Sequence, residues 1–240
     1  MRIVPAGDAA LLVEFPARID PAVSAAAVTL ARAVRDACGG RIRDVVVGYC
    51  SATVYFDPLQ VDVTWLESVV RGVAGRPEPF HAEADAPADW ESGVRSIQPP
   101  VDDAVVDVPV CYGGVYGPDL PEVAAFAGLT IDEVIALHSA TTYRVYVVGF
   151  VPGFPYMASV DPRIAIPRRT TPRTRVAAGS VAIAAGQTGI YPCETPGGWH
   201  LIGRTHVNPY DPSRPEPFLF KPGDAVRFHP VDRDEFDSRA

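Results

Sequence analysis

The sequence has 240 residues, enough for one large domain or two small ones. Hydrophobic residues make up 48% and charged residues 21%, which excludes a chain that is disordered throughout. The net charge of −8 argues against nucleic-acid binding through a general basic surface.

The first apolar residues are interrupted by Asp8 and Glu14, which argues against a signal peptide. Apolar stretches elsewhere stay well short of the roughly 20 residues that a membrane-spanning helix needs. The four cysteines form no C-x-x-C pair and have no histidine at zinc-finger spacing. We therefore expect a cytoplasmic protein without a membrane segment, and we expect reduced cysteines and no metal site.

Residues 1–75 are predicted to form a small N-terminal α/β sandwich. Short apolar runs at 11–15, 45–48 and 53–56 are typical of strands. Between them, Asp20 and Pro21 mark the start of a helix, and Gly39 marks its end. Apolar residues at 65, 66, 69, 70 and 73 predict a second helix, so that strands and helices alternate as in a sheet covered by helices.

Residues 76–104 have a different composition. The stretch 81–104 contains six acidic residues, one arginine and three prolines, with little periodic apolar pattern. Such a segment cannot bury enough apolar surface to offset the entropy lost on ordering. We expect a linker or an insert between two domains.

Residues 105–240 are predicted to form a second domain that is rich in β-structure. Helices are expected at 121–127, ended by Gly128, and after the capping box of Thr130 and Glu133. Apolar β-rich runs follow, separated by Gly and Pro turns, which favours an antiparallel barrel or sandwich. These runs are residues 144–150, 180–186, 199–203 and 225–230.

Motifs for nucleotide binding or self-contained hydrolysis are absent from the sequence. It contains no G-x-x-x-x-G-K-[ST] phosphate loop, no G-x-S-x-G elbow and no H-E-x-x-H pair. If ATP is used, this chain alone lacks the usual residues for binding it. The unusual residues are concentrated instead in four blocks of the second domain, at 143–156, 167–176, 186–192 and 194–205.

These four blocks read YRVYVVGFVPGFPY, PRRTTPRTRV, GQTGIYP and ETPGGWHLIGRT. Together they closely resemble the allophanate hydrolase subunit 1 family, over roughly residues 108–230. The sequence departs mildly from the family where Ala185 replaces a glycine before Gln187 and where Thr195 replaces a serine. The resemblance implies an α+β protein with two domains, whose C-terminal domain is a cyclophilin-like antiparallel β-barrel.

The resemblance also implies a subunit of an ATP-dependent 5-oxoprolinase, which opens 5-oxo-L-proline to L-glutamate. The implied partners are a C-type subunit, similar to allophanate hydrolase subunit 2, and an A-type lactam-utilisation subunit. ATP is then used by the complex, and this chain is expected to be inactive alone. Two alternatives stay open: a subunit of the allophanate hydrolase or urea carboxylase type, and a module that inhibits a sensor histidine kinase.

A carboxylate-bearing lactam suggests which arginines to consider. A guanidinium matches a carboxylate with two parallel charge-assisted hydrogen bonds. Arg144 and Arg173 are the first candidates, followed by Arg168 and Arg169. The alternative is that these arginines stabilise loops.

The remaining candidates come from the same blocks and the preceding helix. Gln187 can both donate to and accept from a lactam, and Glu194 is a candidate base for water. Thr195 and Trp199 are further candidates for substrate binding, although filling the core is the favoured interpretation of Trp199. His138 is a candidate proton carrier, with a capping role at its helix end as the alternative.

Overall fold

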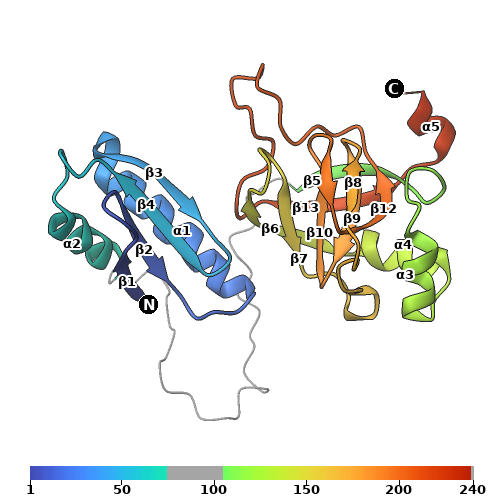
Figure 1. Ribbon diagram of the computed structural model, residues 1–240, viewed down its shortest axis with the longest axis horizontal. Helices are drawn as coiled ribbons and strands as arrows, with labels where there is room; N and C mark the ends of the chain where they lie inside the picture. The colour runs from blue at the N-terminus through green and yellow to red at the C-terminus, as the bar shows by residue number, and fades with distance from the viewer. Residues whose placement is uncertain (75–104, 239–240) are drawn as a thin grey trace, which may run out of the picture. The chain divides into compact units, whose positions relative to one another are not determined.

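The structure is a computed structural model that describes residues 1–74 and 105–238. It divides into two compact units, residues 1–102 and 103–240 (Figure 1). The expected linker at 76–104 lies outside the described residues. Each unit is described by itself.

The N-terminal unit is a four-stranded antiparallel sheet with two helices. Its strand order is β1-β2-β4-β3. Helix α1 packs on β3 and β4, and α2 packs on α1, so that one apolar core lies between sheet and helices. The elements are β1 (Arg2–Pro5), β2 (Ala10–Glu14), α1 (Pro21–Cys38), β3 (Ile42–Val47), β4 (Ser51–Phe56) and α2 (Val63–Ala74). Strand β1 was not predicted.

Helix α1 begins and ends where the sequence predicts. The carboxylate of Asp20 accepts hydrogen bonds from the backbone N–H groups of Ala22 and Val23, at 2.8 and 3.4 Å. Gly39 has a φ of 53°, a left-handed conformation that glycine adopts at low cost. These contacts are local, which is why sequence alone predicts them.

The C-terminal unit is a closed barrel of seven strands in the order β10-β7-β6-β13-β5-β12-β9. The expected β-barrel is therefore confirmed, with one correction. Strands β13 and β5 run parallel, whereas the other neighbouring pairs are antiparallel, so the barrel is mixed. The strands are β5 (Val106–Tyr112), β6 (Thr142–Val148), β7 (Pro155–Ala158), β9 (Ser180–Ala184), β10 (Gln187–Ile190), β12 (His200–Arg204) and β13 (Ala225–Pro230).

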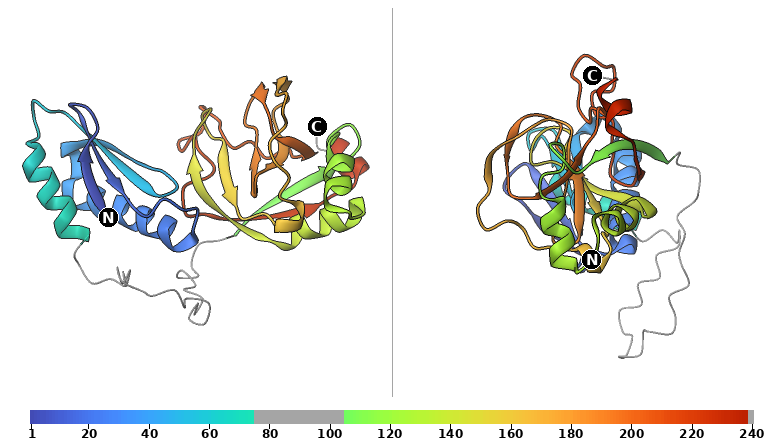
Figure 2. Two further views of the ribbon diagram at one scale, coloured as in Figure 1. Left: turned by 60° about the horizontal axis from the view of Figure 1, so that its bottom comes forward. Right: turned by 90° about the vertical axis from the view of Figure 1, so that its right-hand side faces the viewer.

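Helices α3 (Leu120–Ala127) and α4 (Ile131–Ala140) lie together beside the barrel (Figure 2). Gly128 ends α3 in the left-handed conformation, and Thr130 and Glu133 form the predicted capping box of α4. Apolar residues of both helices join the barrel core. A short helix, α5 (Arg233–Asp237), follows the last strand.

A separate two-stranded sheet joins two of the sequence blocks. Strand β8 (Arg173–Val176) pairs antiparallel with β11 (Thr195–Gly197). Beside it lies a second apolar cluster that includes Phe154, Tyr191 and Trp199. Within the described residues, no helix combines the length and the apolar character needed to cross a membrane.

Candidate functional site

A small pocket with aromatic walls lies where the four sequence blocks meet in the C-terminal unit. Its volume is about 290 Å³. The aromatic lining residues are Phe150, Phe154, Tyr156, Tyr191 and Trp199. Arg168, Pro172 and the segment 195–198 complete the lining. Aromatic side chains combined with a few polar groups in a concave site are typical of small-molecule binding.

Phe154 is the centre of the aromatic wall. Its ring contacts Tyr156, Tyr191 and Trp199 edge-to-face, with centroids 4.8, 5.1 and 5.4 Å apart. Phe154 and Trp199 are buried, so their rings cannot move aside easily. The wall is therefore preformed.

Phe150 stands at the rim in an unusual conformation. Its side chain is 64% exposed, and its φ of 70° is in the left-handed region, which a bulky residue rarely adopts. Its ring meets Phe154 edge-to-face at 5.9 Å. Exposed aromatic surface and backbone strain at one position are features that cluster at ligand-binding loops.

Tyr191 and the Pro-Gly-Gly turn form a tight contact in the pocket wall. A Cβ atom at Gly197 would lie 2.3 Å from Tyr191 Oη, so only glycine allows this approach. The Trp199 backbone lowers the pKa of Tyr191, but burial has the larger effect. Burial raises the pKa of Tyr191 to about 12, and the phenol is therefore neutral and can donate its proton in a hydrogen bond.

Arg168 is the cation of the pocket lining. Its side chain is exposed, and among the described residues it forms no ion pair and no hydrogen bond. Its positive charge lowers the pKa of two lining phenols, Tyr156 and Tyr191. Burial raises both pKa values, and this effect is the larger one. A guanidinium in this position can bind an anionic group of a ligand.

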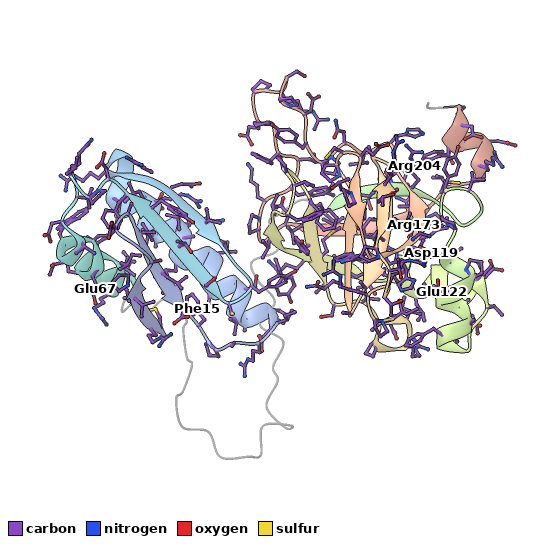
Figure 3. All side chains as sticks on the ribbon, viewed as in Figure 1. Phe15, Glu67, Asp119, Glu122, Arg173 and Arg204 are labelled. Carbon is purple, nitrogen blue, oxygen red and sulfur yellow. The ribbon has the colours of Figure 1, made fainter. Side chains whose placement is uncertain are left out.

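The neighbouring arginines are held by acidic residues. Arg173 makes two hydrogen bonds to Asp119, and Arg169 contacts both Asp119 and Glu122. Figure 3 labels Arg173, Asp119 and Glu122, which come from β8 and from the start of α3 and lie next to one another. The carboxylate of Asp119 also accepts a hydrogen bond from the Leu201 N–H at 2.7 Å.

The structure brings only part of the expected site together. Thr195 and Trp199 line the pocket, as expected for substrate contacts. Arg173 is occupied by Asp119. Arg144 donates to the carbonyl oxygen of Gly223 at 2.7 Å, and so stabilises a turn. Gln187 begins β10 and lies outside the pocket lining.

Glu194 also lies outside the lining, although it directly precedes Thr195. Both of its oxygens accept hydrogen bonds from Arg175, at 3.0 and 2.8 Å. This pairing lowers the pKa of Glu194 and makes its carboxylate a weaker base. Its position does not support the expected role as a general base for water.

His138 lies in the barrel core and not at the pocket. Its Nδ1 is 2.7 Å from the Tyr112 hydroxyl, and its Nε2 is 2.9 Å from the Thr188 hydroxyl. Burial lowers the pKa of His138 to about 3, so the ring is neutral at physiological pH. A proton carrier must reach its substrate, and we therefore leave His138 out of the proposed site.

Two features of the site were missed in the sequence. Phe150 and Phe154 were not among the expected site residues, although the density of aromatics in block 143–156 was a signal for a pocket wall. Asp119 was not singled out, because an acidic residue before a helix is common and nothing local indicates its arginine partners. Among the described residues, no three His, Cys, Asp or Glu side chains gather as metal ligands.

A wider pocket of about 560 Å³ lies in the N-terminal unit. Phe15 and Cys50 are among its lining residues, together with Arg2 and Glu14. The two charged residues pair with each other at 2.6 Å, so the charges of this lining compensate each other. We therefore place the candidate site in the barrel.

The sequence matches the model of a protein family described as carboxyltransferase domain, subdomain C and D, over residues 1–220. The chain belongs to this family. Among characterised relatives, the 5-oxoprolinase B subunit of Bacillus subtilis (strain 168) is 37% identical over 229 residues, which cover 92% of this chain and 89% of that protein. The family therefore spans both units of the chain.

A second relative, the 5-oxoprolinase B subunit of Escherichia coli O157:H7, is 49% identical over 141 residues. This match covers 59% of the present chain and 63% of the E. coli protein. This match is shorter than the one with the B. subtilis protein and has a higher identity. One part of the chain is therefore more similar to the E. coli relative than the remainder of the chain is.

Several solved structures share the fold of this chain. The TTHA0988 crystal structure in space group P6522 matches 93% of this chain with a TM-score of 0.76 and 36% identity, yet the match spans only 40% of the TTHA0988 chain. PH0987 of Pyrococcus horikoshii is also 36% identical, with a TM-score of 0.54 and full coverage of its own chain. The K. lactis urea amidolyase, at 20% identity and a TM-score of 0.70, shares the fold.

Proposed function

We propose that this chain is the B subunit of an ATP-dependent 5-oxoprolinase, the enzyme that opens 5-oxo-L-proline to L-glutamate. The observation that carries the proposal is the 37% identity to the 5-oxoprolinase B subunit of Bacillus subtilis, over 89% of that protein. The E. coli relative of the same name supports it. The urea amidolyase likeness concerns the fold alone, and fold does not determine substrate.

The pocket residues do not fit ATP. A triphosphate needs several cations or a cradle of backbone N–H groups, and the part of the lining that the structure describes has one guanidinium, that of Arg168. The volume of about 290 Å³ is just below the usual range for ligand pockets, about 300–1,000 Å³. We therefore assign ATP to another subunit of the complex and derive no step through it in this chain.

The proposed activity needs partner subunits. Among the described residues, the pocket lining contains no carboxylate and no histidine that could serve as a general base for water. A C-type subunit and an A-type lactam-utilisation subunit are the proposed sources of the missing groups. The longer TTHA0988 chain, of which this fold is 40%, supports a module that works beside further protein.

Within this subunit, we assign the pocket to the lactam substrate. Trp199 and the rings around Phe154 provide apolar faces for a flat five-membered ring. Thr195 and Tyr191 add hydroxyl groups that can hydrogen bond to the lactam N–H and carbonyl. Arg144, Arg173 and Gln187 are left out of this assignment because of their placement.

Reconstitution tests the proposal. The purified chain alone is expected to show no ATP hydrolysis that depends on 5-oxoproline, whereas the chain with its C- and A-type partners should release glutamate. Allophanate and urea serve as competing substrates in the same assay. Turnover by the isolated chain, or a complex that consumes urea or allophanate but not 5-oxoproline, contradicts the proposal.

A further inference from the structure

We infer that Arg168 binds the carboxylate of the substrate, and that the ligand class of the pocket is a small flat ring bearing one carboxylate. This inference rests on the proposed function and adds a specificity residue to it. It also replaces the sequence-based candidates, Arg144 and Arg173, with a residue that was ranked behind them.

The first support is the contrast between Arg168 and the arginines around it. Arg169, Arg173 and Arg175 each contact a carboxylate of this chain, whereas Arg168 has no acidic partner among the described residues. A carboxylate of this chain already compensates the charge of each of these three arginines, so a ligand carboxylate gains less from them. Of these four, Arg168 is the guanidinium whose charge no carboxylate of the described residues compensates.

The second support is the position of Arg168 beside the pocket wall. A Cβ atom added to Gly198 would lie 3.7 Å from Arg168 Nη2, so the guanidinium reaches the Pro-Gly-Gly turn that forms one wall. The absence of a side chain at Gly198 leaves this space open. A carboxylate bound here would lie next to the ring-binding aromatic residues.

The third support is the way the neighbouring residues hold the Arg168 backbone. The Arg169 N–H donates to the Gly198 carbonyl oxygen at 2.9 Å, which ties the loop to the opposite wall. The Asp119 carboxylate binds the side chains of Arg169 and Arg173. It also accepts a hydrogen bond from the backbone N–H of Leu201, in the segment after Trp199. One buried carboxylate thus holds residues on both sides of the pocket.

The pocket also fits the rest of such a ligand. Its volume of about 290 Å³ and edge-to-face aromatic wall suit one small ring and exclude a large cofactor. Arg168 on one side and the apolar faces on the other separate the carboxylate from the ring. This arrangement distinguishes 5-oxoproline from an uncharged lactam.

The test uses the assembled complex with 5-oxoproline and with its carboxamide analogue, in which the charged group is neutral. Arg168→Ala should raise KM for 5-oxoproline by roughly 10- to 100-fold, the range for losing a charge-assisted hydrogen bond, with kcat within about threefold. Arg168→Lys should recover part of the loss. Arg227→Ala, which removes an exposed arginine paired with Asp107 outside the pocket lining, should leave KM unchanged.

Comparing the acid with its carboxamide analogue tells whether Arg168 recognises the carboxylate or only supports the structure. The wild-type complex should prefer the acid, and Arg168→Ala should abolish most of that preference, which a loss of packing alone would not do. The inference is overturned if Arg168→Ala leaves KM for 5-oxoproline unchanged or keeps the preference for the acid. It is also overturned if the variant assembles more weakly with the C-type subunit without any effect on KM. If Arg168→Ala does not assemble into the complex, two other results would overturn the inference. The first is a wild-type complex that shows no preference for the acid, and the second is an Arg168→Lys variant with wild-type kinetics. An inactive wild-type complex contradicts the proposed function itself.

Discussion

Asp119 and Arg173 form a two-point ion pair, with Arg173 Nη1 2.8 Å from Asp119 Oδ2 and Nη2 2.6 Å from Oδ1. The Asp119 side chain is 6% exposed and that of Arg173 is 27% exposed. The pair therefore lies at the edge of the interior, where loss of one partner leaves the other poorly solvated. The same carboxylate holds Arg169 and the Leu201 N–H, so it connects α3, β8 and β12.

We expect Asp119→Ala to lower the free energy of barrel unfolding by about 3–5 kcal/mol, the usual cost of leaving a buried charge without its partner. Urea unfolding followed by Trp199 fluorescence measures this, with Trp65 and Trp90 replaced by Phe. Asp107→Ala is the matched control, because it breaks the exposed pair with Arg227 and should change stability little. Equal effects of the two variants contradict this prediction.

A second prediction concerns His138 and pH. Its pKa is about 3 in the folded chain because of burial, compared with 6.5 for a free histidine. Between these values the unfolded chain binds a proton that the folded chain does not, so stability is lost as pH falls from about 6.5 toward 3. His138→Gln removes this term. The difference in unfolding free energy between wild type and variant should therefore shrink by about 1.4 kcal/mol per pH unit within this window.

The measurement is urea unfolding of both proteins at several pH values between 4.5 and 7.5. Other carboxylates also change stability in this range, but they are common to wild type and variant and cancel in the difference. Parallel curves for the two proteins would show that His138 takes up a proton in the folded state.

Gly197→Ala tests the tight contact in the pocket wall. A Cβ atom there would lie 2.3 Å from Tyr191 Oη, and Tyr191 is 2% exposed and cannot move freely. We expect a loss of about 1–3 kcal/mol of stability, as is typical of overpacking. Gly198→Ala is the matched control, since its Cβ would meet Pro172 at an ordinary 3.6 Å. An unfolding free energy of Gly197→Ala equal to that of the wild type would contradict this prediction.

Glu194→Gln tests the sequence-based general base. Arg175 holds the Glu194 carboxylate and lowers its pKa, and the residue lies outside the pocket lining. We expect kcat of the assembled complex to stay within about threefold of wild type, compared with the roughly 10²–10⁴-fold loss for removing a general base. A loss in that larger range, with assembly intact, would restore Glu194 to catalysis.

Assembly with the C-type subunit is the last prediction. The described lining of the pocket has no carboxylate or histidine, and the proposed function therefore requires a partner that completes the site. A stable interface buries about 1,200–2,000 Å² in total. The co-expressed pair should elute as one heteromeric peak in size-exclusion chromatography at micromolar concentration, and separate elution of the two chains would contradict it.

Local signals in the sequence were enough for helices α1 to α4 and for the general architecture, whereas the short helix α5 was not predicted. Asp20, Gly128 and the pair Thr130–Glu133 act on backbone groups a few residues away, so their effect is visible without any tertiary contact. The barrel was expected from the four-block resemblance and from the Gly and Pro turns between short strands. The parallel pair β5–β13 was not expected, because strands distant in sequence can pair in either direction.

The site depended on tertiary structure for the same reason. Local sequence does not reveal that Arg173 meets Asp119, 54 residues away, or that His138 meets Thr188, 50 residues away. These long-range contacts engage two of the predicted site residues and leave Arg168 without an acidic partner among the described residues. The amino-acid sequence determined which side chains the chain carries near the pocket. Strand register and helix packing decided which of those side chains neutralise one another and which can meet a ligand.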